Sequence, residues 1–172
     1  MRNIIFFEQK IAFLLVCLSI LFGFIYGIEF GDIKKIEVME FDDMNFIKVF
    51  FQILFHNFFV GIVIIGCSIF FYIGSAIPVV ITFFVFGESF ATIFKENGIF
   101  TAIGTYPHLI PEAFSIILTL GIAFAISSKL LKVVFKHESL KKNNNKIFFS
   151  FIVSNILLIL AAFIEALKIC YY

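Results

Sequence analysis

Histidine and glutamate side chains occur inside otherwise apolar segments of this chain, where ionisable groups are costly to place. His108 and Glu112 are four residues apart, so a helix that carries both presents them on one face. Imidazole and carboxylate groups bind Zn²⁺ and other divalent ions, and acids inside a membrane often mark ion or proton paths. The strongly polar set consists of His56, Asn57, Glu88, His108, Glu112 and Glu165.

This polar set has three open interpretations. The side chains can hydrogen-bond across helices and fix their packing, which is the interpretation we favour. They can form a transport or proton site. They can also bind a divalent metal, because histidines and carboxylates together suit Zn²⁺ or a similar ion. The ligands would then be His56, His108, Glu112 and Glu165, and no other cofactor is expected.

The spacing of these residues does not match the catalytic motifs that use them. An intramembrane metalloprotease needs two histidines on one helix, as in HExxH, whereas His108 to Glu112 read HxxxE. The chain also has no GxSxG motif and no glycine-rich phosphate-binding loop. We therefore expect no enzymatic activity.

The composition indicates the environment in which these groups lie. Hydrophobic residues make up 62% of the chain and charged residues 15%, and the mean hydropathy is +1.09. A soluble protein of 172 residues could not bury so much apolar surface, so this is an integral membrane protein of the lipid bilayer. The net charge of +1 shows no excess of basic residues of the kind that nucleic-acid-binding proteins carry. Cys17, Cys67 and Cys170 have no CxxC spacing, and we assign them no redox or metal role.

Apolar runs of about 20 residues, the length that spans a bilayer, predict an all-α bundle with five transmembrane helices in a single domain. Residues 49–87 lack any charge and are long enough for two spans, and Gly74 to Pro78 supply the break between them. An acidic loop, 29–48, and a basic loop, 129–146, separate other spans. The predicted helices are about 11–28, 49–73, 77–94, 108–128 and 147–167.

The distribution of lysine and arginine predicts the orientation in the cell membrane. The N-terminal segment and the 129–146 loop carry more of these residues than the other side, so both are predicted to be cytoplasmic. An odd number of spans then places the C-terminus and the 29–48 loop outside the cytoplasm. With these directions, the ionisable residues all fall in the outer half of the bilayer.

Small residues on two of the predicted helices indicate close helix contacts. Gly61 and Gly66 lie in the second helix, and Ala113 and Gly121 lie in the fourth. Together with the polar groups they exceed what one five-helix bundle must bury, which predicts a homodimer. Other membrane or envelope proteins are possible partners.

Three segments resemble the stage II sporulation protein M family. The first runs from Pro107 to Ala113 and contains the Pro-His-x-x-x-Glu core. The others are the His56-Asn57 pair and the Ala161-to-Ala166 segment, which contains Glu165. The resemblance covers roughly residues 51–167. Where the family usually has an Asn-Gly pair, this chain has Gly87-Glu88.

The resemblance implies a polytopic helical protein without catalytic activity, in which His108, Glu112 and Glu165 are important. The family's namesake looks like a scaffold that recruits cell-wall hydrolases to the engulfing membrane. We therefore expect a membrane scaffold or recruitment protein. The alternative is a small transporter or channel that uses the His/Glu cluster to carry a proton, an ion or a metal.

Overall fold

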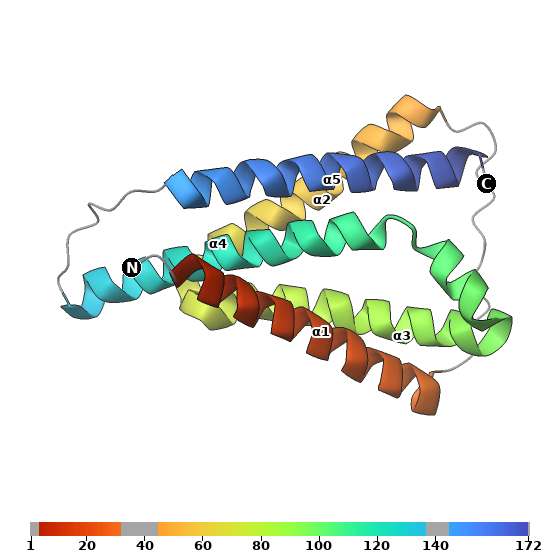
Figure 1. Ribbon diagram of the computed structural model, residues 1–172, viewed down its shortest axis with the longest axis horizontal. Helices are drawn as coiled ribbons and strands as arrows, with labels where there is room; N and C mark the ends of the chain where they lie inside the picture. The colour runs from red at the N-terminus through yellow and green to blue at the C-terminus, as the bar shows by residue number, and fades with distance from the viewer. Residues whose placement is uncertain (1–3, 32–44, 137–144, 172) are drawn as a thin grey trace.

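The computed structural model describes residues 4–31, 45–136 and 145–171, and in them every regular element is helical. This confirms the all-α prediction. The loop residues 32–44 and 137–144, which belong to the predicted acidic and basic loops, lie outside the described residues. The elements are α1 (Ile4–Phe30), α2 (Phe46–Gly66), the short 3-10 helix η1 (Cys67–Phe70), α3 (Phe71–Thr105), α4 (Leu109–Lys136) and α5 (Asn145–Tyr171), as Figure 1 shows.

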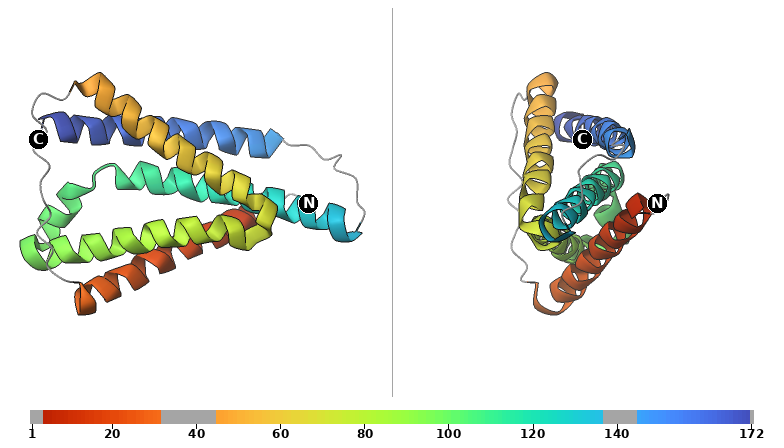
Figure 2. Two further views of the ribbon diagram at one scale, coloured as in Figure 1. Left: turned by 180° about the vertical axis from the view of Figure 1, so that it is seen from behind. Right: turned by 90° about the vertical axis from the view of Figure 1, so that its left-hand side faces the viewer.

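The helices extend lengthwise beside one another and alternate in direction, so that α1 begins and α5 ends at opposite ends of the bundle (Figures 1 and 2). α4 is the central helix, because it contacts each of the other four. Its candidate membrane span is 50% buried inside the protein, against 17–28% for the other spans. Leu120, Ala123 and Phe124 of α4 lie in the hydrophobic core, where they pack among residues of α1, α2 and α3.

Four helical segments are long and apolar enough to cross a membrane: Phe7–Phe30, Phe46–Thr105, Leu109–Phe135 and Asn145–Tyr171. The second of these, 60 residues long, joins α2, η1 and α3. Large apolar side chains such as Phe55, Phe59 and Ile73 remain exposed on the outside of the bundle. Such exposed apolar side chains are typical of a protein whose outer surface faces lipid rather than water.

The turn between α2 and α3 lies earlier than the sequence predicts. We expected a break at residues 74–78, but the chain turns at Cys67–Phe70, and α3 continues through Gly74 and Pro78. A Cβ on Gly74 would lie 2.5 Å from the carbonyl oxygen of Cys67, so this glycine allows close packing against the turn rather than breaking a helix. Ser75 then fastens α3 to α2, because its Oγ donates to the carbonyl oxygen of Ile64 at 2.9 Å.

α3 and α4 also extend beyond the spans predicted from the sequence. Residues 95–107 lie between two of the predicted spans, but α3 reaches Thr105 and bends at Gly98, whose φ of 81° and ψ of 174° are non-helical. After this bend the last two turns of α3 fold back toward the bundle (Figure 1). The first part of the predicted 129–146 loop is helical, because α4 continues to Lys136.

Candidate functional site

His108 lies at the connection between α3 and α4, directly before the first residue of α4. Its carbonyl oxygen accepts a hydrogen bond from the backbone N–H of Glu112 at 3.2 Å, which fixes the two residues one helical turn apart. The ring of Tyr106 packs edge-on against the imidazole, with 6.3 Å between ring centroids. The connection therefore holds the histidine over the start of α4.

Glu112 of α4 and Glu165 of α5 converge on this imidazole. His108 Nε2 lies 3.8 Å from Glu112 Oε2 and 3.8 Å from Glu165 Oε2. One nitrogen or oxygen atom from each of the three residues lies within 4.8 Å of the other two. The three side chains are largely buried, with exposed fractions of 13%, 21% and 27% for His108, Glu112 and Glu165. We call these three residues the His/Glu junction.

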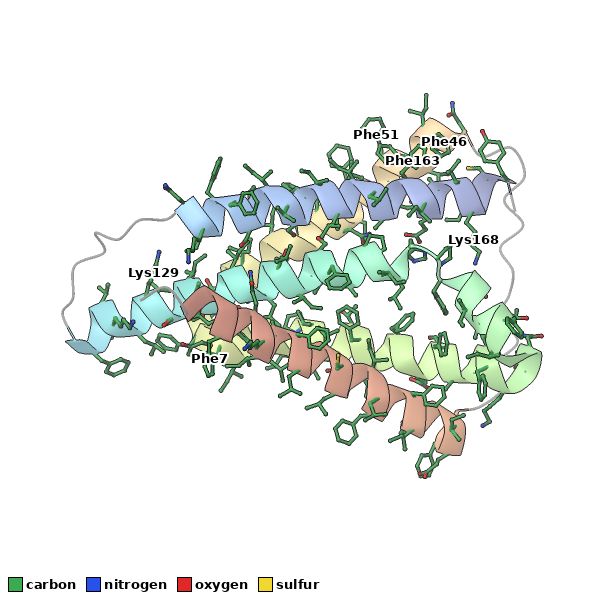
Figure 3. All side chains as sticks on the ribbon, in the orientation of Figure 1. Phe7, Phe46, Phe51, Lys129, Phe163 and Lys168 are labelled. Carbon is green, nitrogen blue, oxygen red and sulfur yellow. The ribbon has the colours of Figure 1, made fainter. Side chains whose placement is uncertain are left out.

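Lys168 adds a positive charge beside the His/Glu junction. It lies on α5 within one turn of Glu165, at the opposite end of the bundle from Lys129 (Figure 3). Its Nζ donates a hydrogen bond to the carbonyl oxygen of Thr105 at the end of α3. Its charge also acts on Glu165 and on His108.

Burial lowers the pKa of His108, and the nearby ammonium of Lys168 lowers it further. The imidazole is therefore neutral at neutral pH, with one ring nitrogen able to act as a ligand. The Nδ1 atom is buried and has no hydrogen-bond partner among the described residues. Nε2 is the nitrogen that faces the two carboxylates.

The other residues predicted to join the cluster lie outside the junction. His56 is exposed on α2 in the neighbourhood of Glu165, but it is not part of the group within 4.8 Å. Asn57, also on α2, lines a groove against α4 and α5. Glu88 is half-buried on α3, where its backbone lies close to Gly27 of α1, and its side chain has no ion pair with the described residues.

Hydroxyl groups continue the polar surface one and two turns deeper along α4. Ser115 Oγ donates to the carbonyl oxygen of Ser154 at 2.9 Å, and the two Oγ atoms are 3.0 Å apart. Thr119 Oγ1 lies 2.8 Å from Ser154 Oγ and donates to the carbonyl oxygen of Ser115. This network ties α4 to α5 between the His/Glu junction and the apolar core.

Glu8 is a buried acid that the sequence analysis missed. It is 4% exposed on α1, and its Oε2 atom is buried without a hydrogen-bond partner among the described residues. Ser128 and the charge of Lys132, both on α4, act on the carboxylate. The stretch before residue 11 was interpreted only as a polar flank. A helical spacing that includes the buried Ala12, Val16 and Ser19 places Glu8 on the same inward face, and this signal could have identified it.

Comparison with known proteins gives a family. No curated protein and no solved structure matches the chain. A model of the stage II sporulation protein M family matches residues 12–167, which is most of the chain and includes the whole His/Glu junction. The chain therefore belongs to the stage II sporulation protein M family, whose membrane-helical character agrees with the fold described above.

Proposed function

We propose that this protein is a membrane scaffold that crosses the bilayer five times and binds a divalent cation at the His/Glu junction. The single observation that supports cation binding is the position of His108 Nε2, 3.8 Å from an oxygen of each carboxylate. This separation is too long for a hydrogen bond. Two ligands each about 2.1 Å from a tetrahedral zinc lie about 3.4 Å apart, so a small inward movement would complete such a site.

The charges at the junction favour a bound cation, because the two carboxylates outnumber the one ammonium group. With a neutral His108, the residues at the site carry two carboxylates and the ammonium of Lys168. Buried carboxylates that face one another need a positive partner between them, either a proton or a metal ion. One imidazole nitrogen and two carboxylates are ligands that Zn²⁺ and related ions accept. A fourth coordination position would remain for water or a further ligand.

The five-span topology is supported by the length of the segment that contains α2 and α3. Sixty residues of helix extend about 90 Å, three times the hydrocarbon thickness of about 30 Å. The reversal at η1 divides this segment into two antiparallel crossings. Arg2 and Lys10 near the start of α1, with the lysines near the end of α4, favour a cytoplasmic N-terminus. The His/Glu junction and the C-terminus would then lie on the outer side.

The scaffold role is supported by the position of the junction. Glu112 and Glu165 belong to different helices, and Lys168 holds the end of α3, so a bound cation would fix α3, α4 and α5 relative to one another. Fixed helices present a constant surface to other membrane or envelope proteins. The apolar core residues Leu120 and Phe124 lie on α4 beyond the hydroxyl network, where they pack against α1, α2 and α3.

Ion transport is the second candidate, and the hydroxyl network is the observation that favours it. Ser115 and Thr119 continue the polar face of α4 from Glu112 toward the middle of the membrane. A transporter would use this face as the first half of its path, and conduction would need the apolar core to move.

The cation is tested on the whole protein, purified in detergent and dialysed against Zn²⁺ or Mn²⁺. We expect one metal ion per chain by elemental analysis, and a metal-dependent rise in the melting temperature. Glu112→Gln and Glu165→Gln should each remove both effects. Glu29→Gln is the matched control, because Glu29 is an exposed acid near the end of α1. Metal binding that persists in both junction variants would overturn the proposal.

Two further measurements separate the remaining alternatives. In a cysteine-free background, Glu29→Cys and Asn145→Cys should react with an impermeant maleimide from opposite sides of the membrane, because both positions are exposed near helix ends. Labelling from one side contradicts five spans. In liposomes, a scaffold should carry no metal or proton flux. Flux that is lost in Glu112→Gln but kept in Glu29→Gln would favour the transporter.

A further inference from the structure

A groove opens between α2 and α5, with α4 as its floor. Half of its lining residues are phenylalanine, isoleucine or leucine. The other half are small or polar and come from all three helices: Asn57 and Gly61 of α2, Ser115 and Thr119 of α4, and Ser154 and Asn155 of α5. The two sides of the groove belong to helices whose outer faces are apolar and exposed, including Phe55 and Ile156. The groove is therefore mainly apolar, with a few polar groups set into a surface that faces lipid.

Two amide side chains in this groove lack full hydrogen bonding. Asn57 is half-buried, and its side chain makes no hydrogen bond with the described residues. Asn155 donates from Nδ2 to the carbonyl oxygen of Phe151 at 2.7 Å, within its own helix, and its Oδ1 accepts no bond from the described residues. Hydrocarbon chains can neither donate nor accept, so lipid in the groove would leave both amides unsatisfied.

The two amides also lie at the same depth. Asn57 is nine residues, or about 14 Å, before the end of α2 at Gly66. Asn155 is ten residues, or about 15 Å, after the start of α5 at Asn145. These two helix ends lie toward the same end of the bundle (Figure 1). Both amides are thus near the middle of a hydrocarbon core of about 30 Å.

We propose that this groove binds a second copy of the chain, with Asn57 of one copy hydrogen-bonded to Asn155 of the partner subunit. A two-fold axis makes every contact occur twice, so Asn155 of the first copy meets Asn57 of the partner subunit. An amide is both donor and acceptor, and the two pairs therefore satisfy all four side chains. A second copy of the chain therefore supplies a matching amide for each of these side chains, without any other partner.

The lining of the groove allows the backbones to approach. A Cβ placed on Gly61 would meet only a methyl group of Thr119, at 3.9 Å, so space remains on the groove side of α2. Small residues at membrane helix interfaces permit such close packing, and interhelical hydrogen bonds from asparagine strengthen it. The inference is independent of cation binding, because no residue of the His/Glu junction lines the groove.

The test is the monomer–dimer equilibrium of the full chain in bilayers, measured by fluorescence energy transfer across a range of protein-to-lipid ratios. We expect a dimer for the natural sequence. Asn57→Leu removes both amide pairs and should raise the dissociation constant about tenfold. Gln52→Leu is the matched control, since Gln52 is an exposed amide on the same helix outside the groove, and it should leave the equilibrium unchanged.

A second measurement locates the contact directly. In a cysteine-free background, chains with Asn57→Cys mixed with chains with Asn155→Cys should crosslink with a short bismaleimide, whereas Gln52→Cys should not. A monomer at every protein-to-lipid ratio would overturn the proposal. So would equal weakening by Asn57→Leu and Gln52→Leu, or native mass spectrometry that shows a monomer with a retained phospholipid.

Discussion

A Cβ atom on Gly23 of α1 would lie 2.0 Å from the backbone carbonyl oxygen of Phe84 in α3. The relationship is reciprocal, because a Cβ on Gly87 of α3 would lie 2.3 Å from the carbonyl oxygen of Ile20 in α1. The two helices therefore meet backbone against backbone. Such contact is the common way for membrane helices to gain packing energy, since lipid offers no hydrophobic driving force between them.

Alanine at these glycines should destabilise the protein. Gly23→Ala and Gly87→Ala each place a methyl group where another backbone stands, and overpacking of this kind costs about 1–3 kcal/mol or more. Thermal unfolding in detergent, followed by circular dichroism, measures the effect. Gly66→Ala is the control, because nothing lies within 4 Å of a Cβ there and its φ of −61° is helical. A loss at Gly66 as large as at Gly23 would refute the argument.

The hydroxyl network between α4 and α5 should contribute measurably to stability. Ser154→Ala removes the hydroxyl that lies 3.0 Å from Ser115 Oγ and 2.8 Å from Thr119 Oγ1. Hydrogen bonds between membrane helices contribute about 0.6 kcal/mol on average and up to about 1.7 kcal/mol, so we expect a loss in that range or slightly above it. Thr82→Ala is the comparison, because Thr82 bonds only to its own helix at Pro78 and is exposed.

The buried acid of α1 should also stabilise the fold. Glu8→Ala removes the buried carboxylate on which Ser128 and Lys132 act, which should cost about 1–3 kcal/mol. Glu8→Gln keeps a hydrogen-bond acceptor and should cost less. Chemical unfolding in a mixed detergent gives both values. Glu29→Ala, an exposed change on the same helix, should be nearly neutral, and an equal loss there would contradict a specific role for Glu8.

Features set by local spacing could be predicted from the sequence. His108 and Glu112 are four residues apart, so they share one face of any helix that contains both. The apolar runs are long enough to predict membrane-spanning helices without knowledge of the fold. The contact of Glu165 with His108 depends on how α5 packs on α4, which local spacing does not determine. The predicted spans place His108 and Glu165 in the same half of the bilayer. They place His56 at a similar depth, yet His56 lies outside the junction, so depth alone does not predict the contact.

Other features depend on tertiary contacts that override local preference. Pro78 and Gly74 are typical of a helix boundary, yet both lie inside α3 because the hydrogen bond from Ser75 and the packing of Gly74 against Cys67 place the turn earlier. Glu8 precedes the apolar run, and its burial results from the length of α1 and the approach of α4. A charged residue before an apolar run usually lies outside the membrane-spanning helix, so composition alone could not identify the burial of Glu8.

Lys168 should oppose the cation that we propose for the His/Glu junction. Its ammonium acts on Glu165 and His108, and a positive charge beside a cation site lowers affinity by Coulomb repulsion. Lys168→Gln should therefore raise the affinity for Zn²⁺ about tenfold. It should also lower the melting temperature of the metal-free protein, because a shorter, uncharged amide replaces the ammonium that donates to the carbonyl oxygen of Thr105. Isothermal titration calorimetry and metal-dependent unfolding measure the two effects separately.

Lys95→Gln supplies the matched control. Lys95 Nζ donates to the carbonyl oxygen of Ile28 at 2.7 Å, so it holds the end of α1 as Lys168 holds the end of α3. It does not act on the residues of the junction. Both variants should lose stability without metal, but only Lys168→Gln should gain affinity. Equal Zn²⁺ affinities in the two variants would mean that the cation does not bind beside Lys168, and binding elsewhere would then have to be sought.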